Sequence, residues 1–440
     1  MSKNRLAGPR GNRVLNTLKF MRDPYACYAK WREQYGSTFL IKALNGDVVV
    51  TCDTENIRRV FACPSDAVGQ FAVDTAKPLM GESSVILVQG EPHRKLRAAI
   101  SPSFRGELMA GESSKIQDVA MRVAENWPVG QTFPIMKPAL EVSLEVITRI
   151  VFGVQDQARV DVYKKKITDF VSSFHPVLAF SKLLQRPLFG LSPWAKFIAA
   201  RDDLFSLLDE DIHAKPGCPF TETNLLGRLA NLDDEQGRKW EVKTIRDQLV
   251  TMLLAGHETT QIAIAWAMSW LHRNPSILER LRGELSLNDD IDELLKNQLL
   301  EGVCLEALRL NSVVSDIVRT LRKPLDLIDV KLEAGTNVGV AICLVHEDPD
   351  IYPDPKMFNP DRWFNKTAKP NEFMPFGGGV RRCIGASLAM LELKTVVATW
   401  VKHFQFELPE DAPATEATYR RNITMAPKSG IPLKFLGATK

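Results

Sequence analysis

The chain has 440 residues, of which 45% are hydrophobic and 25% charged, the profile of a globular protein that can enclose a bulky ligand in its core. A formal net charge of +3 gives no sign of a nucleic-acid partner. The seven scattered cysteines form no C-x-x-C pair, which argues against a zinc site and a disulfide framework and favours a reducing cytoplasm.

The N-terminal third begins with a basic lead-in of about twenty residues. Its first thirteen residues hold four Lys or Arg and no apolar run, so we expect neither a signal peptide nor a membrane anchor. Residues 37–51 predict a β-hairpin turning at Asn45-Gly46, because Asn-Gly supplies the positive φ angles of a tight two-residue turn. From about residue 90 to 310, apolar residues three and four apart predict helices.

The C-terminal part alternates between extended, irregular and helical patterns. Residues 325–340 predict strands, and residues 346–378, with six prolines, predict a long irregular segment of the kind that is usually functional. A final helix is expected over about residues 384–403. We therefore predict one mainly α domain over residues 1–440, with a smaller β-rich region.

A long central helix is predicted over residues 246–271, which are apolar nearly all round, with Thr244 and Asp247 as a capping pair. Its middle reads Ala255-Gly256-His257-Glu258-Thr259-Thr260. Glycine costs about 1 kcal/mol inside a helix, and a buried carboxylate without a partner costs more, so packing alone does not explain this stretch. The alternative is a polar stripe on an amphipathic helix. A zinc motif H-E-x-x-H is excluded because Gln261 stands at the second histidine position.

The strongest local signal is the run from Phe376 to Gly385, FGGGVRRCIG. Three glycines permit a tight turn with inward-facing amides. Cys383 follows at the start of the last helix, where the helix dipole and neighbouring arginines favour a thiolate, a good soft metal ligand. Gly385 would let a flat cofactor lie close to the helix. The alternative is an inert buried cysteine, the usual fate of a single Cys.

These residues match the cysteine pattern of the cytochrome P450 family, F-x-x-G-x-R-x-C-x-G, at every fixed position. The resemblance extends from about residue 20 to 435. Three further elements match in the family's order, together with its H-x-x-x-R helix: Ala255–Thr260, Glu306–Arg309 as E-x-x-R, Phe358–Trp363, and His93–Arg97. After Arg309 the family commonly has prolines, whereas this chain has Leu310 to Val314, which leaves the pocket shape near residues 313–317 open.

The resemblance implies the P450 fold and haem b, with Cys383 as the axial thiolate of the iron. It implies that two haem propionates are bound by His93, Arg97 and Arg381, with Arg319 as a fourth residue, since cations match buried carboxylates. Further contacts to the haem are expected from Ala255, Phe376 and Gly385. Glu306, Arg309 and Arg362 are expected to form a buried ion cluster that serves folding and haem retention.

The resemblance also implies a reaction. Glu258 and Thr259 correspond to the acid–alcohol pair that delivers protons for dioxygen activation, and thiolate donation favours O–O cleavage. We expect a monooxygenase that inserts one atom of O2 into a hydrophobic terpenoid, steroid, fatty acid or polyketide. The expected pocket draws on these stretches: Phe71–Leu87, Phe170–Leu191 (with Phe174, Phe180 and Phe189), Leu254–Thr259, Val313–Val318 and Ile423–Met425.

Electrons should come from a separate ferredoxin or flavodoxin-type donor, docking near Cys383 on Arg94, Lys95 and Arg382. We expect a cytoplasmic monomer with no nucleic-acid or membrane partner. Two alternatives share the cysteine loop: a haem-thiolate isomerase or dehydratase, and a non-enzymatic haem sensor. Neither needs the Glu258–Thr259 pair, and no signalling module is visible in the sequence.

Overall fold

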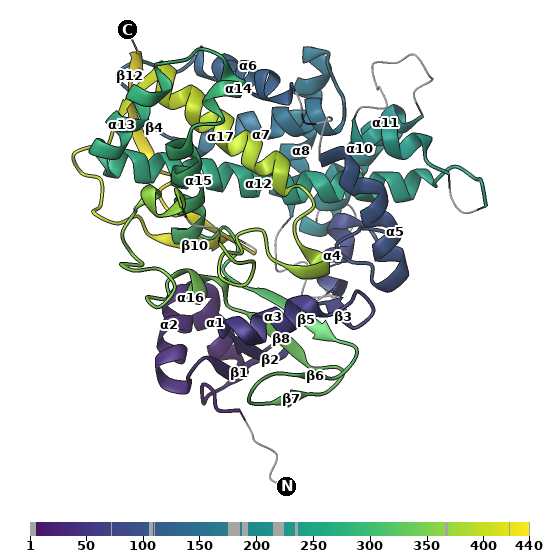
Figure 1. Ribbon diagram of the computed structural model, residues 1–440. Helices are drawn as coiled ribbons and strands as arrows, with labels where there is room; N and C mark the ends of the chain where they lie inside the picture. Colours follow the sequence, from purple (N-terminus) through teal and green to yellow (C-terminus); the bar gives the residue numbers. More distant parts are fainter. Residues whose placement is uncertain are drawn as a thin grey trace.

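Helices make up most of the computed structural model, and a smaller β-rich part lies at the end where the chain begins (Figure 1). The structure describes residues 6–71, 73–104, 109, 111–174, 185–186, 192–213, 224–233, 236–365, 368–421 and 423–439. No helix among these residues is long and apolar enough to cross a membrane.

The β-rich part is a five-stranded sheet with its own hydrophobic core. The strand order is β1-β2-β8-β5-β3, and the β2–β8 pair is parallel whereas the others are antiparallel. The strands are β1 (Thr38–Ala43), β2 (Gly46–Thr51), β3 (Val68–Gln70), β5 (Ile317–Leu321) and β8 (Asn337–Val340). The helices of this part are α1 (Arg13–Arg22), α2 (Pro24–Tyr35), α3 (Thr54–Ala62) and α16 (Ile342–His346), with a small hairpin of β6 (Leu325–Asp326) and β7 (Lys331–Leu332).

The helical part surrounds the 32-residue helix α12 (Val242–Arg273), which runs through the larger core. The other helices are α4 (Val73–Met80), α5 (Gly90–Ile100), α6 (Glu112–Ala124), α7 (Met136–Val146) with a π-turn η3 (Ile147–Val151), α8 (Gln157–Ser173), α10 (Pro193–Ile212), α11 (Leu225–Asn231), α13 (Pro275–Leu285), α14 (Ile291–Leu294), α15 (Gln298–Leu310) and α17 (Ala386–His403). Two small sheets close this part: β4 (Thr132–Pro134) with β12 (Pro432–Ala438) and β9 (Phe404–Glu407), and β10 (Thr418–Arg421) with β11 (Thr424–Pro427).

The first hairpin forms as predicted, but its turn lies one residue earlier. Ala43 pairs with Gly46, so the two loop residues are Leu44 and Asn45 rather than Asn45 and Gly46. Neither loop residue has a positive φ; Gly46, at φ +117°, takes the unusual backbone conformation as the chain leaves the turn. Glycine is therefore needed here for the exit from the turn, not for its centre.

The predicted capping pair of the central helix is wrong. α12 begins at Val242, after Glu241, so Thr244 and Asp247 both lie inside the helix. The buried carboxylate of Asp247 instead accepts the backbone N–H of Ser83 at 3.0 Å. Burial raises the pKa of Asp247, and the hydrogen bond from Ser83 opposes that rise. The residue that resembled a helix cap in the sequence therefore forms a long-range hydrogen bond, which joins α12 to the segment before α5.

The irregular segment is confirmed. Between residues 347 and 378, leaving aside 366–367, the only helical element described is the short 3-10 helix η5 (Pro360–Trp363). The chain then passes through the 3-10 turn η6 (Gly379–Arg381) into α17, which begins two residues later than predicted.

Candidate functional site

The cysteine loop is a tight turn folded against α3. The N–H of Cys383 donates to the carbonyl of Phe376 at 2.9 Å, which closes the loop. Gly377 and Gly379 have φ of +65° and +64°, conformations that favour glycine. A Cβ on Gly378 would overlap the ring of Phe61 on α3, and one on Gly379 would overlap the Phe61 carbonyl. The three glycines therefore serve both the turn and a contact with α3 that the sequence pattern did not reveal.

Cys383 lies three residues before the first residue of α17 and is exposed. Although Cys383 is exposed, nearby protein atoms desolvate its thiol and raise its pKa, while the N–H of Gly385 and the charges of Arg382 and Arg97 lower it. The groups expected to favour a thiolate thus act in the predicted direction, but desolvation outweighs them in the protein alone. Apart from its two chain neighbours, no atom of the described residues lies within 4 Å of a Cβ placed on Gly385, so there is room beside the start of the helix.

Four predicted cation-bearing residues come together next to this loop: His93 and Arg97 on α5, Arg319 on β5 and Arg381 on η6. Burial, with the neighbouring charges of Arg319 and Arg97, lowers the pKa of Arg381 to about 10. Burial and the charges of Arg381 and Arg97 lower the pKa of His93 to about 4, so its imidazole is neutral near pH 7. The cluster thus concentrates positive charge in a partly buried place.

Hydrogen bonds to backbone carbonyls hold Arg381 and Arg97 of this cluster in place, and two other nitrogen atoms of the cluster make no such bond. Arg381 donates to the carbonyls of Ile86 at 3.0 Å and Val88 at 2.7 Å, and Arg97 donates to the carbonyl of Arg382 at 2.6 Å. His93 Nδ1 and Arg381 Nε are buried and have no hydrogen-bond partner among the residues that the structure describes. Buried polar atoms are nearly always hydrogen-bonded, so two such atoms in one cationic cluster suit an anionic ligand.

The acid and alcohol of α12 point to different partners. Thr259 Oγ1 donates to the carbonyl of Ala255, one turn earlier, at 2.7 Å. Glu258 Oε1 lies 3.0 Å from Nε of Arg421, at the end of β10. Burial raises the pKa of Glu258, and Arg421 and Thr424 lower it. The sequence did not identify Arg421, which is 163 positions away and reaches Glu258 only because the β10–β11 hairpin lies against α12.

Gly256 lies in the middle of the central helix without interrupting it. α12 is continuous from Val242 to Arg273. A Cβ on Gly256 would lie 2.9 Å from Cδ1 of Ile147, at the start of η3, so the missing side chain leaves room for that residue.

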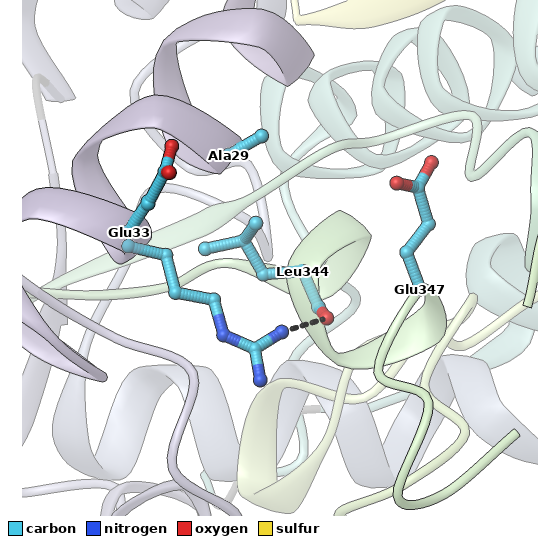
Figure 2. A pocket seen from close by; sticks show the side chains of 5 residues that line it. Ala29, Glu33, Leu344 and Glu347 are labelled. Carbon is cyan, nitrogen blue, oxygen red and sulfur yellow. Dashed lines mark hydrogen bonds between the residues drawn. The ribbon is translucent and has the colours of Figure 1, made fainter.

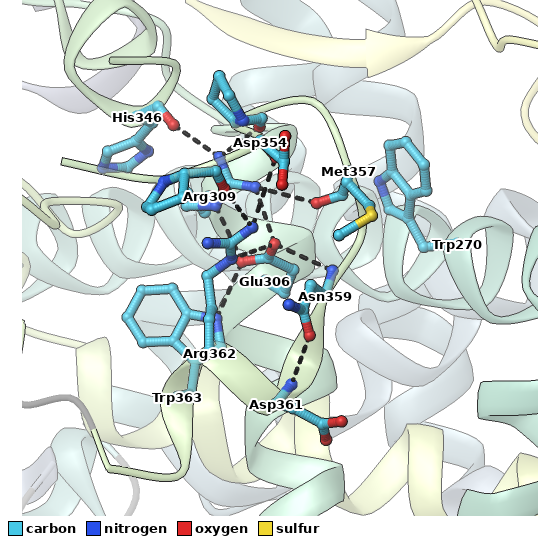
Figure 3. Close-up of polar contacts among 12 residues, drawn as sticks. Trp270, Glu306, Arg309, His346, Asp354, Met357, Asn359, Asp361, Arg362 and Trp363 are labelled. Atoms are coloured by element: carbon cyan, nitrogen blue, oxygen red, sulfur yellow. Dashed lines mark hydrogen bonds and ion pairs between the residues drawn. The ribbon is translucent and has the colours of Figure 1, made fainter. Parts of the chain in front are cut away.

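Figure 3 shows the predicted ion cluster around Glu306, and its geometry confirms the prediction. The fully buried carboxylate accepts Nε and Nη2 of Arg309 at 2.9 and 2.8 Å and Nε of Arg362 at 2.8 Å. It also accepts two donors that the sequence did not suggest, the N–H of Asn359 at 3.2 Å and the indole of Trp363 at 3.0 Å. Glu306 thereby ties α15 to the irregular segment.

A buried histidine that sequence reasoning missed joins this cluster to the cysteine loop. His346 Nε2 accepts the N–H of Met374, two residues before Phe376, at 3.0 Å. That leaves Nδ1 to carry the proton towards Ser312 Oγ, 2.8 Å away. Burial, with Arg309 nearby, lowers the pKa of His346 to about 3 and keeps the ring neutral. No local motif marks this residue in the sequence.

The predicted substrate pocket is only partly described. Phe180 and Phe189 lie outside the described residues, whereas Phe174 and Leu254 are half-buried against the helical core. Met425 is buried and Ile423, next to the turn of the β10–β11 hairpin, is exposed. A separate surface hollow between α2 and α16, shown in Figure 2, is lined by Ala29, Arg32, Glu33, Leu344 and Glu347. None of the predicted site residues lines that hollow.

The cytochrome P450 family model matches residues 7–434. The chain belongs to the cytochrome P450 family. Putative cytochrome P450 138 of Mycobacterium tuberculosis is 29% identical over 425 residues, 96% of this chain and 94% of the relative. Putative cytochrome P450 135B1 of the same organism is 30% identical over 435 residues, 97% and 90% of the two chains. The solved structure of a retinoic-acid-bound cyanobacterial CYP120A1 has a TM-score of 0.86 at 23% identity and full coverage of both chains, which shows the fold.

Family membership establishes the chemistry in general terms: this P450 is a haem-thiolate monooxygenase, an oxidoreductase whose haem iron has an axial cysteine thiolate. The residues present fit such a cofactor. The cation cluster with its two unbonded buried nitrogens matches the propionates, the accessible thiol of Cys383 is a soft ligand, and the space beside Gly385 admits a flat ring.

Proposed function

We propose that Cys383 is the axial ligand of the haem iron and that this P450 hydroxylates a hydrophobic small molecule of the terpenoid, steroid, fatty-acid or polyketide kind. The observation that carries the proposal is the position of Cys383. It lies just before α17, close enough to Arg97 of the cation cluster for the charge of Arg97 to lower the pKa of the thiol. Gly385, Phe376 and Ala255 of α12 would contact the haem ring.

Four residues hold the propionates in this proposal. Arg381 and Arg97 are fixed by the carbonyl groups that accept their other donors. Arg319, whose guanidinium donates to Gln70 Oε1 at 3.2 Å, adds a half-buried cation, and desolvation lowers its pKa to about 10. His93 contributes a neutral N–H donor. The two propionate carboxylates would offset the repulsion that the three guanidiniums exert on one another in the protein alone.

When bound through a thiolate, haem supplies dioxygen activation, and thiolate donation favours O–O cleavage. The protein supplies protons at Thr259 Oγ1. Glu258 takes them from solvent through the side of α12 that meets Arg421, whose own side chain is 42% exposed. Burial raises the pKa of Glu258 above its ordinary value, the direction that favours a group relaying protons. An isomerase or dehydratase has no need of this pair.

Half-buried apolar side chains support a hydrophobic substrate. Ile86, Phe174 and Leu254 come from three of the stretches expected to line the pocket, and each packs against the helical core while keeping some exposed surface. The substrate is held by apolar contact over most of its surface.

An acidic ferredoxin or flavodoxin-type protein supplies the electrons in this proposal, and the P450 acts as a cytoplasmic monomer. Lys95 on α5 and Arg382 beside Cys383 are exposed and place positive charge on the docking face. Arg94, expected to share this role, is paired with Glu91 at 2.7 Å, so its charge is largely compensated locally.

The decisive test of the ligand is the spectrum of the reduced carbon monoxide complex. Cys383→Ala removes the thiolate-type Soret band, whereas Cys27→Ala, at a half-buried cysteine of α2, leaves it unchanged. If the band survives in Cys383→Ala, another residue is the ligand and the proposed site is wrong.

A further inference from the structure

Helix α1 carries an apolar stripe that faces away from the protein. Four large apolar side chains, Val14, Leu15, Leu18 and Met21, are 42–56% exposed. At about 100° per residue they fall within an arc of about 120°, the width of a stripe that normally faces a core. The opposite side of the helix is the one that packs: Asn16 is buried, and Phe20 contacts Tyr28 and Trp31.

The turn of the first hairpin extends this stripe. The N–H of Leu44 donates to Thr17 Oγ1 of α1 at 3.0 Å, and Thr17 lies beside Val14 and Met21 on the helical projection. Leu44 is itself 56% exposed. Five large apolar side chains from α1 and the β1–β2 turn are thus held together on one surface, next to β1 in the lower part of Figure 1.

The positive charge around this surface indicates which kind of partner it can bind. Residues 1–22 contain six Lys or Arg and no Asp or Glu. Lys19 and Arg22 are exposed and lie along the Leu15 edge of the stripe. An apolar helix face with a basic edge is typical of helices that lie in the interface of an anionic bilayer. A second copy of the chain would bring the same cations to the contact and be repelled.

We propose that α1 and the Leu44 turn form a docking surface for an anionic lipid bilayer, on which the protein lies without crossing it. The apolar side chains enter the headgroup boundary while Lys19 and Arg22 meet lipid phosphates. This differs from the expectation that the chain has no membrane partner, which rested on the lack of an anchor in the first thirteen residues. It does not depend on the proposed substrate or on the identity of the haem ligand.

The surface adjoins the part of the P450 that reaches the catalytic helix. The guanidinium of Arg420 on β10 lies 5.0 Å from the ring centre of Phe20, and the next residue, Arg421, pairs with Glu258. Because Phe20 lies on the side of α1 that packs against the protein, α1 stands between the proposed bilayer surface and the β10–β11 hairpin.

The test is co-sedimentation of the full-length haem-loaded protein with vesicles of phosphatidylcholine containing phosphatidylglycerol, and with vesicles of phosphatidylcholine alone. The protein should sediment with the first and much less with the second. Leu18→Ser combined with Met21→Ser should weaken binding at least ten-fold. Lys19→Glu should weaken it about five-fold or more, since each cation near an anionic surface contributes about that factor.

The matched control is Val129→Ser combined with Leu287→Ser, two exposed apolar residues elsewhere on the surface. This variant should bind vesicles like the parent, and all variants should keep the carbon monoxide spectrum of the parent. The proposal is overturned if the parent stays in solution with both vesicles, or if the control variant loses binding as much as the α1 variant. It is also overturned if the α1 variant abolishes a dimer of the parent, because the stripe would then be a contact between copies.

Discussion

Glu392 lies in the middle of α17 with its side chain in the core between α17 and α7. It is almost fully buried, and Ser143 Oγ donates to its carboxyl at 2.6 Å. Burial raises the pKa of Glu392 from 4.5 to about 7, and the bond from Ser143 lowers it slightly. The folded protein therefore holds a proton here over a pH range in which the unfolded chain has released it.

Between about pH 4.5 and 7 the folded state binds this proton more tightly, so its stabilising effect is complete below the unfolded pKa and is lost as the pH rises through the folded value. Raising the pKa from 4.5 to about 7 stabilises the folded state by about 3 kcal/mol at pH values well below 4.5. Glu392→Gln keeps the shape and removes the titration. The free energy of unfolding of Glu392→Gln, taken relative to the parent, should therefore be about 2.5 kcal/mol more favourable at about pH 8 than at about pH 5.

The assay is urea-induced unfolding of the haem-loaded protein, followed by tryptophan fluorescence at both pH values. The difference in the free energy of unfolding between variant and parent is taken at each pH, and the two differences are then compared. The contributions of all other titrating groups, which parent and variant share, cancel in this comparison. Thr395→Val, fully buried three residues later in the same helix, changes no ionisable group, so its effect should not depend on pH. Equal effects of Glu392→Gln at the two pH values would refute the buried neutral carboxyl.

Three further predictions concern the site and its support. Glu306→Gln should lower the free energy of unfolding by about 3–5 kcal/mol, because it leaves Arg309 and Arg362 buried without a carboxylate. Thr259→Ala should keep the carbon monoxide spectrum but lower the rate of product formation on the order of 10²-fold, with reducing equivalents lost to hydrogen peroxide. Arg421→Gln removes a charge that lowers the pKa of Glu258, so the pH profile of product formation should shift upwards.

Each of these has a neighbour as its control. Glu301→Gln, at a half-exposed side chain of α15, should cost less than about 1 kcal/mol. Thr260→Ala should still use its reducing equivalents for product formation rather than for hydrogen peroxide. Arg420→Gln should leave the pH profile of product formation unchanged. A Glu306 variant within about 1 kcal/mol of the parent, full product yield in Thr259→Ala, or equal profiles for the two arginine variants would contradict the respective role.

Local patterns predicted the parts of this protein that depend on neighbouring residues. The glycine run before Cys383, the i,i+3 pair Glu306–Arg309 and the apolar periodicity of α12 each report a backbone geometry that a few residues determine. The Leu44–Asn45 turn shows the limit of such patterns. Its position depends on the pairing of β2 with β8, almost three hundred residues later, as well as on the Asn-Gly pair.

Contacts between distant segments could not be read from the sequence. Phe61 lies against the glycines of the cysteine loop, His346 accepts the N–H of Met374, and Asp247 accepts that of Ser83. Each joins two elements whose meeting is decided by tertiary packing, and none leaves a periodic or spaced signal. Asp247 shows the consequence most directly, since a residue type that caps helices was assigned to a cap while its actual partner lies 164 residues away.

Two residues of α12, Gly256 and Glu258, are unfavourable inside a helix or a core, and both lie where α12 contacts a distant segment. Gly256 costs about 1 kcal/mol relative to alanine in a helix, and its place is explained by Ile147, which fills the volume that a side chain would need. Glu258 is a buried carboxylate, and Arg421 supplies the opposite charge from the β10–β11 hairpin. In both cases the unfavourable residue is matched by one from another element. The sequence can therefore mark a position as requiring a partner, because the local cost is calculable, although the identity of that partner follows only from the fold.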